Sequence, residues 1–372
     1  MEDKISKWGM YSFVHNLTKS TTLGLGTYLM LNISRIDTYI SIIFSALSSF
    51  MFFVIINYIM NNDEKTDIIS LNIRNFGTVI GTIINTVLNF GFFFLACVSL
   101  YNLSQFMENE YIPDTVSIYA KILIILPVIY IADKNIKVIS KVSQMISIII
   151  IAIFFISCIG LIFSVKLDNI FPIMVDGVKP ILKSSFIYTV FSFAPLLLLL
   201  IIPKKRYEDK NFNYKKMFLP YVITSILIAI IILMVIFVFG INLALIYRYP
   251  EYVVLREVSL FTIIERVEKI LSLHFLFSVI LYLVLTIYFM LESIGKVNKK
   301  IRNNKITKYL IGALMVVVAN FMFKNSIEEN FFIQNILTYV ILFTIIVPVF
   351  ISFIGELRYN FKKNKLKKLD VW

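Results

Sequence analysis

The sequence predicts an all-α integral membrane protein with ten transmembrane helices and both termini in the cytoplasm. Three observations support this fold class. Hydrophobic residues make up 59% of the 372 residues, whereas soluble globular domains contain about 45–50%. These residues are grouped in runs close to the ~20 residues that a helix needs to cross a bilayer. The charged residues, with a net charge of +13, lie in short segments between the runs, which favours a membrane surface over nucleic acid as their partner.

The apolar runs follow one another with no polar linker long enough to separate folding units. Residues 1–372 are therefore predicted to form a single transmembrane domain. The third and fifth runs are long enough to tilt or to extend past the lipid, and the ninth is short. The predicted spans are Trp8–Leu31, Thr38–Met60, Gly77–Phe106, Thr115–Ile131, Ile136–Val165, Val178–Ile202, Phe218–Ile241, Ile270–Glu292, Lys308–Phe323 and Phe332–Ile354.

The positive charges are distributed unequally between the two predicted sides of the membrane. With the N-terminus inside, 25 of the 36 Lys and Arg residues fall in cytoplasmic segments and 9 in external segments, while Lys19 and Lys121 lie within spans. Cytoplasmic loops are enriched in Lys and Arg, so this split predicts the orientation and requires an even number of spans. Residues 356–372 form a basic cytoplasmic tail, and Lys121 is expected to extend to the membrane surface.

Span one contains a polar run followed by two glycines. Residues 19–22 read Lys-Ser-Thr-Thr and precede the Gly-Leu-Gly of residues 24–26. A break in the helix here would expose backbone amides, which suit an anion such as a carboxylate. The alternative is that the glycines only let two helices pack closely. We favour the break, because four polar residues cover a full turn that would otherwise face lipid, and Lys19 becomes a functional candidate.

Span six is interrupted by Pro195, which removes one helical hydrogen bond. Neighbouring Tyr188 and Ser192 can satisfy the freed carbonyls, and a simple proline kink is the alternative. The interruptions of spans one and six fall at the same place in two five-span halves. Paired broken helices point to an inverted-repeat transporter fold with a midplane site, with repeat one at about 1–166 and repeat two at about 167–355.

Other polar side chains lie within the predicted spans. Asn85 and Asn89 are one turn apart in span three and either join helices or contact a ligand. His274 in span eight either relays protons or ions together with Lys19 or is a structural hydrogen-bonding residue. No carboxylate is expected at mid-membrane, so ordinary proton symport is not supported.

The external segment between spans seven and eight has apolar residues at helical spacing, namely Val258, Phe261, Ile264 and Val267. This pattern predicts an amphipathic helix on the outer surface, which is either an interface anchor or a lid over an outer vestibule. The sequence contains no phosphate loop, metal-binding histidine pair or nucleophile elbow. We therefore expect no enzyme activity, no cofactor and no metal.

Six short motifs, in order along nearly the whole chain, carry a resemblance to a known family. They are Leu-Gly-Leu-Gly at 23–26, Phe-Gly-Thr-Val-Ile-Gly at 76–81, Asp-Asn-Ile-Phe-Pro-Ile-Met-Val-Asp-Gly at 168–177, Phe-Ser-Phe at 191–193, Tyr-Pro at 249–250 and Ile-Glu-Arg-Val-Glu at 264–268. In order and spacing they resemble the spore germination permeases, the B subunits of endospore nutrient germinant receptors. This family lies within the amino acid–polyamine–organocation superfamily.

The resemblance implies a LeuT-like fold in the spore inner membrane. It implies a receptor subunit that binds a small nutrient, with an amino acid expected, and that acts with an A subunit and a lipoprotein C subunit. A small-solute transporter using the same site and a membrane scaffold without a ligand are the alternatives. The chain departs from the family near the expected site: it has His15 or Asn16 in place of a Gln, Ala194-Pro195 in place of Gly-Glu, and His274 near a usual Trp.

The two broken helices predict a site for a zwitterionic ligand. The backbone amides of Gly26 and Thr27 are expected to receive a carboxylate, and carbonyls near Ser192 an ammonium group, while Asn89 and Phe93 form a side wall. The predicted ligand-binding residues are Thr22, Gly24, Gly26, Thr27, Asn89, Phe93, Tyr188, Phe191 and Ser192.

Overall fold

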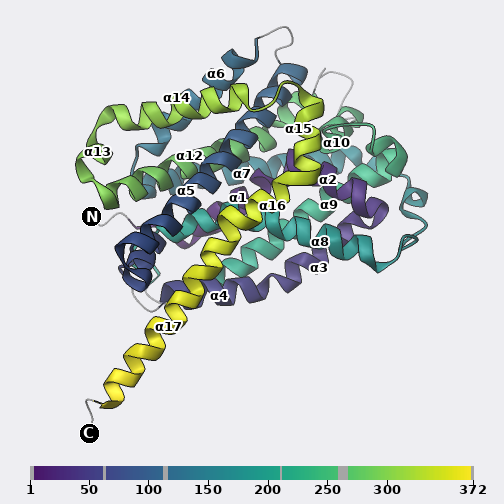
Figure 1. Cartoon of the computed structure of the whole chain (residues 1–372). Helices are drawn as coiled ribbons and strands as arrows, with labels where there is room; N and C mark the ends of the chain where they lie inside the picture. The colour runs from purple at the N-terminus through teal and green to yellow at the C-terminus, as the bar shows by residue number, and fades with distance from the viewer. Residues whose placement is uncertain (1–3, 62–63, 112–115, 210–211, 259–266, 370–372) are drawn as a thin grey trace.

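The computed structural model shows a bundle of helices (Figure 1). Within the described residues the regular elements are all helical, and the one isolated backbone bridge joins Ile5 to Tyr207. The described residues are 4–61, 64–111, 116–209, 212–258 and 267–369. The amphipathic segment around Phe261, predicted to be a lid or anchor, lies largely outside these ranges.

The first half of the chain begins with an interrupted helix, and its later helices include the long α5 and α7. Thr38–Ser48 and Phe50–Asn61 are separated only at Ser49, so they continue one another along the second span. The elements are α1 (Lys7–Ser20), the π-helical turn η1 (Thr22–Gly26), α2 (Thr27–Ser34), η2 (Arg35–Asp37), α3 (Thr38–Ser48), α4 (Phe50–Asn61), α5 (Ile68–Glu110), α6 (Ser117–Ala132), α7 (Ile136–Leu161), η3 (Ile162–Ser164) and η4 (Leu167–Ile170).

The second half repeats this arrangement, with its interruption again in the first span. The elements are α8 (Val178–Phe193), η5 (Pro195–Ile201), η6 (Lys204–Arg206), η7 (Tyr214–Met217), α9 (Phe218–Ala244), α10 (Pro250–Val253), η8 (Val254–Glu257), α11 (Val267–Leu271), α12 (Leu273–Val297), α13 (Lys299–Asn303), α14 (Lys305–Phe321), α15 (Ser326–Phe332), η9 (Ile333–Leu337), α16 (Thr338–Ile341), η10 (Leu342–Ile346) and α17 (Val347–Leu369).

Helical segments match all ten predicted spans in order. By length and composition, seven helical stretches in the described ranges can cross a membrane, and the apolar helix Ser117–Ala132 is shorter. The first stretch, Lys7–Asn61, contains predicted spans one and two, which are separated at Arg35, where φ is 49°. Predicted span nine corresponds to α14, Lys305–Phe321. The number of segments that cross the membrane and their orientation stay predictions.

The length of the third apolar run is explained by a break in α5. The helix begins at Asp67, whose carboxylate accepts a hydrogen bond of 3.0 Å from the amide of Ser70. At Gly77 the backbone leaves the helical region with φ 80° and ψ 174°, a conformation that glycine adopts readily. The predicted span therefore starts at this break, and residues 68–76 form a separate arm.

The predicted basic tail is a continuation of the last helix. Figure 1 shows the end of α17 extending beyond the bundle. Near the bundle, Glu356 is fully buried and forms a 2.5 Å ion pair with Arg74 from the arm of α5. This contact fixes the start of the basic segment to the folded domain.

The interrupted helices lie at the centre of the bundle. The α1 helix packs against α7, α9 and α12, and α8 packs against α2 and α3. Their side chains are correspondingly buried, including the full polar run at residues 18–22. The centre of this protein is therefore partly polar and includes the ionisable side chain of Lys19.

Candidate functional site

The first helix is broken at the predicted position. Leu23 has φ −75° and ψ 141°, and Gly24 has φ 80° and ψ −39°. The hydroxyl groups of the polar residues before the break donate hydrogen bonds to backbone carbonyls. Ser20 donates to the carbonyl of Leu17 and Thr22 to that of Thr18, both at 2.7 Å. These bonds satisfy the hydroxyls away from water, while glycine supplies the left-handed conformation.

The second interruption is a change of helix type at Pro195. The α8 helix ends at Phe193, and a 3-10 helix runs from Pro195 to Ile201. The hydroxyl of Ser192 donates to the carbonyl of Tyr188 at 2.6 Å and lies 2.8 Å from the hydroxyl of Tyr221. The predicted interruption of span six is confirmed, and nearby hydroxyls take part in satisfying the backbone around it.

The two interruptions meet in space. The hydroxyl of Thr21 donates to the carbonyl of Phe191 at 2.5 Å. A Cβ atom added to Gly26 would lie 3.6 Å from the side chain of Phe191. The structure thus brings together seven of the predicted site residues, namely Thr22, Gly24, Gly26, Thr27, Tyr188, Phe191 and Ser192.

A carboxylate of the protein itself lies at the break of helix one. Oε1 of Glu251 accepts a 2.6 Å hydrogen bond from the amide of Gly24 and a 3.0 Å bond from the hydroxyl of Thr27. Glu251 is only 4% exposed. Burial raises the pKa of its carboxyl group, and the hydrogen bonds from Gly24 and Thr27 partly oppose this shift.

This arrangement corrects one sequence-based expectation and brings in two residues that the sequence analysis did not single out. The amides of Gly26 and Thr27 are not free, because they donate to the carbonyls of Thr21 and Thr22; the amide bound by a carboxylate is that of Gly24. The sequence analysis placed no carboxylate at mid-membrane, and it did not single out Glu251 and Glu329, which are both buried inside the bundle. Both residues lie near the ends of apolar runs, and only the folded chain places them inside.

Buried polar and aromatic residues cover one side of the break. Glu329 pairs with Arg248 and accepts a 3.0 Å hydrogen bond from the side-chain amide of Asn102. The hydroxyl of Tyr249 donates to the carbonyl of Asn102 at 3.2 Å. The ring of Phe275 lies directly against Gly24, where an added Cβ atom would come within 2.5 Å of it.

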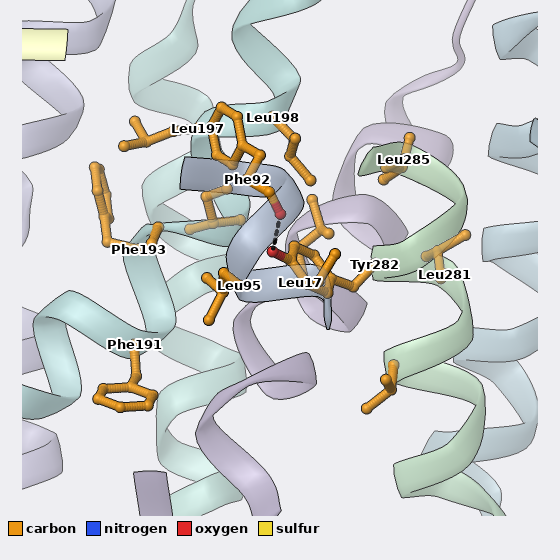
Figure 2. Packing of buried hydrophobic residues seen from close by; sticks show 14 of the residues in the cluster. Leu17, Phe92, Leu95, Phe191, Phe193, Leu197, Leu198, Leu281, Tyr282 and Leu285 are labelled. Atoms are coloured by element: carbon orange, nitrogen blue, oxygen red, sulfur yellow. Dashed lines mark hydrogen bonds between the residues drawn. The ribbon is translucent and has the colours of Figure 1, made fainter. Parts of the chain in front are cut away.

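Apolar side chains close the other side, which carries the N-terminus. Figure 2 shows these side chains gathered in one cluster that includes Leu17, Phe92, Leu95, Leu197, Leu198, Tyr282 and Leu285. The hydroxyl of Tyr282 donates to the carbonyl of Phe92 at 3.4 Å. Residues on both sides of the break are therefore buried and packed against it.

Three nitrogen-bearing side chains lie together beside the break. Lys19 is 2% exposed, and no hydrogen bond or ion pair joins its ammonium group to another described residue. His15 and Lys19 belong to α1, which packs against α12, the helix that carries His274. Nδ1 of His15 lies 3.1 Å from the hydroxyl of Thr224, while its Nε2 is buried without a partner among the described residues. The predicted relay residues Lys19 and His274 therefore lie on two helices that pack against each other.

The remaining predicted residues lie elsewhere. The side-chain amide of Asn89 donates to the carbonyl of Asn85 and to the hydroxyl of Ser293, at 2.8 and 2.7 Å. The residue of α5 that reaches the break is Asn102, whose side chain approaches Gly24. Asn102 is three to four turns, or about 20 Å, further along the helix than Asn89. Asn89 and Phe93 thus lie away from the break, and Asn89 joins two helices.

Comparison with known proteins agrees with this architecture. A solved structure of Mhp1, a nucleobase-cation-symport-1 family transporter in a closed conformation with bromovinylhydantoin bound, has a similar fold, with a TM-score of 0.66 and 11% sequence identity. The match covers 91% of this chain and 76% of that one. No curated protein sequence matches the chain. The family model described as spore germination protein matches residues 5–328. The fold is thus that of LeuT-like transporters, and the chain belongs to the spore germination protein family.

Proposed function

We propose that this chain is the membrane subunit of a spore nutrient germinant receptor and that it binds an amino acid at the break of helix one. It would act in the spore inner membrane together with an A subunit and a lipoprotein C subunit. The family match supports the receptor role. The observation that carries the ligand class is a pair of buried charges flanking the break, the ammonium group of Lys19 and the carboxylate of Glu251.

An amino acid has two charges that complement this pair. Lys19 precedes Gly24 by five residues and has no ionic partner among the described residues. An isolated buried cation is costly in a membrane interior, and a ligand carboxylate would compensate it. Glu251 offers an anion to the ligand's ammonium group. Binding needs only to favour one of two packed arrangements of the helices to produce a signal.

Replacement of Lys19 tests this proposal. Lys19→Met removes the charge and keeps the length of the side chain. We expect the germination response to amino acids to shift to at least about tenfold higher concentration, because a hydrogen-bonded charge contributes about 1.5–3 kcal/mol. The thermal stability of the empty protein should rise, because the uncompensated charge is gone. Dose–response curves of germination and thermal unfolding of the purified protein give the two readouts.

Lys121→Met is the matched control, since Lys121 is also buried but donates to Ser117 and lies over the ring of Tyr101. At equal protein abundance, the germination response of Lys121→Met to amino acids should stay near that of the unaltered protein. If Lys19→Met lowered stability and left the response of the remaining protein unchanged, Lys19 would be a structural residue and the ligand assignment would fail.

A small-solute transporter of the same superfamily is the second candidate function. The fold shared with the transporter Mhp1 favours it. The purified chain in proteoliposomes would then accumulate a labelled amino acid against a gradient, without the other two subunits. A receptor subunit should bind the amino acid without sustained uptake, and multiple turnovers per molecule would decide for transport.

A further inference from the structure

Glu251, which binds the amide of Gly24 at the break of helix one, also lines a small cavity. Its volume is about 20 Å³, and α7, α9, α10, η8 and α12 contribute to its walls. Most of the lining is apolar, from residues such as Phe154, Leu161 and Met234. Three polar side chains also line it: Glu251, His274 and Ser157.

Two of these polar side chains have an atom without a partner. Oε2 of Glu251 and Nδ1 of His274 are buried and lack a hydrogen-bond partner among the described residues. Both side chains are at least nine-tenths buried, with 4% and 5% exposed. An orphaned polar atom in an apolar interior costs about 1–3 kcal/mol, and more for a charged group. Two side chains with such atoms line one cavity, which favours a site built for a bound group.

The third polar group can also accept a hydrogen bond. The hydroxyl of Ser157 donates to the carbonyl of Ile153 at 2.8 Å, which leaves its oxygen lone pairs available. The cavity therefore offers a carboxylate oxygen, a ring nitrogen and a hydroxyl oxygen. All three are acceptors when His274 carries its proton on Nε2. Such a set suits a positively charged group with several N–H donors.

We propose that this cavity binds a primary ammonium group, with Glu251, His274 and Ser157 as acceptors. The group is either the free ammonium ion or the ammonium head of an amine nutrient. A volume near 20 Å³ holds one water-sized group, which matches an ammonium group and excludes a quaternary one. If the bound group is the ammonium head of an amino acid, this assignment rests on the proposed function. The carboxylate of that amino acid would then face Lys19.

The geometry also explains why Glu251 adopts its position. Its Oε1 is held by the amide of Gly24 and the hydroxyl of Thr27, at 2.6 and 3.0 Å. These two bonds leave Oε2 with no partner among the described residues, next to a cavity that His274 also lines. Glu251 therefore connects the cation site directly to the backbone of the broken helix. Binding in the cavity would be sensed at Gly24.

Ligand-induced stabilisation of the full-length protein in lipid nanodiscs tests the proposal. Thermal unfolding is followed in ammonium, methylammonium, tetramethylammonium and sodium chlorides at equal ionic strength. A ligand that binds only the folded state raises the unfolding temperature in a saturable way. We expect a saturable rise with ammonium and no specific rise with tetramethylammonium or sodium. A rise of the unfolding temperature with methylammonium as well would show that the head of a larger amine can enter. A rise with ammonium alone would show that the site binds the free ion.

The variant Glu251→Gln keeps a carbonyl oxygen for Gly24 and Thr27 but removes the charge. Its apparent affinity for ammonium should fall at least about tenfold, since hydrogen bonds to charged groups contribute about 1.5–3 kcal/mol. Ser157→Ala is the second variant and should weaken binding several-fold even if Glu251→Gln is too unstable to isolate. Glu110→Gln makes the same chemical change on a carboxylate that pairs with Arg256 outside this cavity, and its ammonium affinity should be unchanged.

Equal stabilisation by sodium or tetramethylammonium, or unchanged ammonium binding in both cavity variants, would overturn the assignment. This readout does not involve germination. Ammonium binding with no germination response to amino acids would contradict the proposed function alone. An intact amino acid response without saturable ammonium binding would contradict the cation site alone.

Discussion

At the scale of single residues, the two glycines of the Gly-Leu-Gly motif have different roles. Gly24 has φ 80°, and an added Cβ atom would lie 2.5 Å from the ring of Phe275 and 3.1 Å from Oδ1 of Asn102. Gly26 has φ −77°, and the nearest atoms to an added Cβ lie at 3.6 Å, an ordinary contact. The sequence pattern does not show which of the two glycines breaks the helix. The structure shows that it is Gly24, which has the left-handed backbone conformation.

Alanine substitutions should separate the two glycines. Gly24→Ala should lower the free energy of unfolding by about 1–3 kcal/mol, the cost of a strained backbone conformation, and should impair the nutrient response. Gly26→Ala should be close to the unaltered protein in both respects. Thermal unfolding and immunoblotting beside a germination dose–response curve measure these effects. Equal behaviour of the two variants would mean that the break is not the sensitive feature.

Glu251 is expected to make the stability of the protein depend on pH. Burial raises the pKa of its carboxyl group above the ordinary value of about 4.3, so the folded protein binds this proton more tightly than the unfolded chain. The stabilisation is complete below the ordinary pKa and is lost as pH rises through the raised one.

In the absence of ammonium, the unfolding temperature should therefore fall more steeply as pH rises above about 4.3 in the unaltered protein than in Glu251→Gln. The difference between the two curves isolates Glu251 from the other titrating groups. Parallel curves would show that this carboxyl group has the same pKa in the folded and unfolded states.

At the scale of elements, an ion pair closes one side of the site. Arg248 belongs to the segment between α9 and α10, and Glu329 to α15, so their pairing joins two parts of the chain over the break. The side chain of Glu329 has no exposed surface, and that of Arg248 is 18% exposed. Asn102 of α5 completes the contact at 3.0 Å. Opening this side of the bundle requires these bonds to break.

Removing one partner of this pair should be more harmful than removing both. Arg248→Met leaves a buried carboxylate uncompensated and should cost about 3–5 kcal/mol of stability. The double variant Arg248→Met with Glu329→Gln should regain a large part of that loss. Lys308→Met, which breaks a more exposed pair with Asp133, should cost no more than about 1 kcal/mol. Thermal unfolding of the four proteins provides the measurement, and a double variant no better than Arg248→Met would argue against a coupled pair.

At the scale of the whole molecule, the two halves of the chain share one plan. Each half begins with an interrupted helix, at Gly24 in the first and at Pro195 in the second, and the interruptions lie side by side at the centre. The fold match to Mhp1 over 91% of the chain agrees with this plan. The orientation in the membrane follows from the charge distribution and is open to direct test.

Cysteine labelling should reveal the orientation. A membrane-impermeant maleimide added from outside should modify a cysteine introduced at Asp176 and not one introduced at Lys300. Both positions are exposed in the structure, so accessibility reports the side of the membrane rather than burial. The unaltered protein, with Cys97 buried and Cys158 half-buried, is the blank. Labelling at Lys300 but not at Asp176 would reverse the topology.

The sequence by itself determined the fold class, the order of the apolar helical segments and the places where two of them are interrupted. These features depend on local properties: hydropathy over about 20 residues, the conformational freedom of Gly24 and the missing amide hydrogen of Pro195. The helical breaks at 22–24 and at 195 lie where the polar run and the proline predict them.

Only the tertiary structure decided which groups line the site. Glu251 is 227 residues from Gly24 in the chain, and its segment follows an apolar helix like any external connection. Its burial depends on how α10 and η8 pack against α9 and α7. Likewise, Asn102 rather than Asn89 reaches the break, because the position of α5 along its own axis is set by packing against α12 and α14. Contacts between distant segments arise from the shape of the whole bundle, which local sequence patterns do not encode.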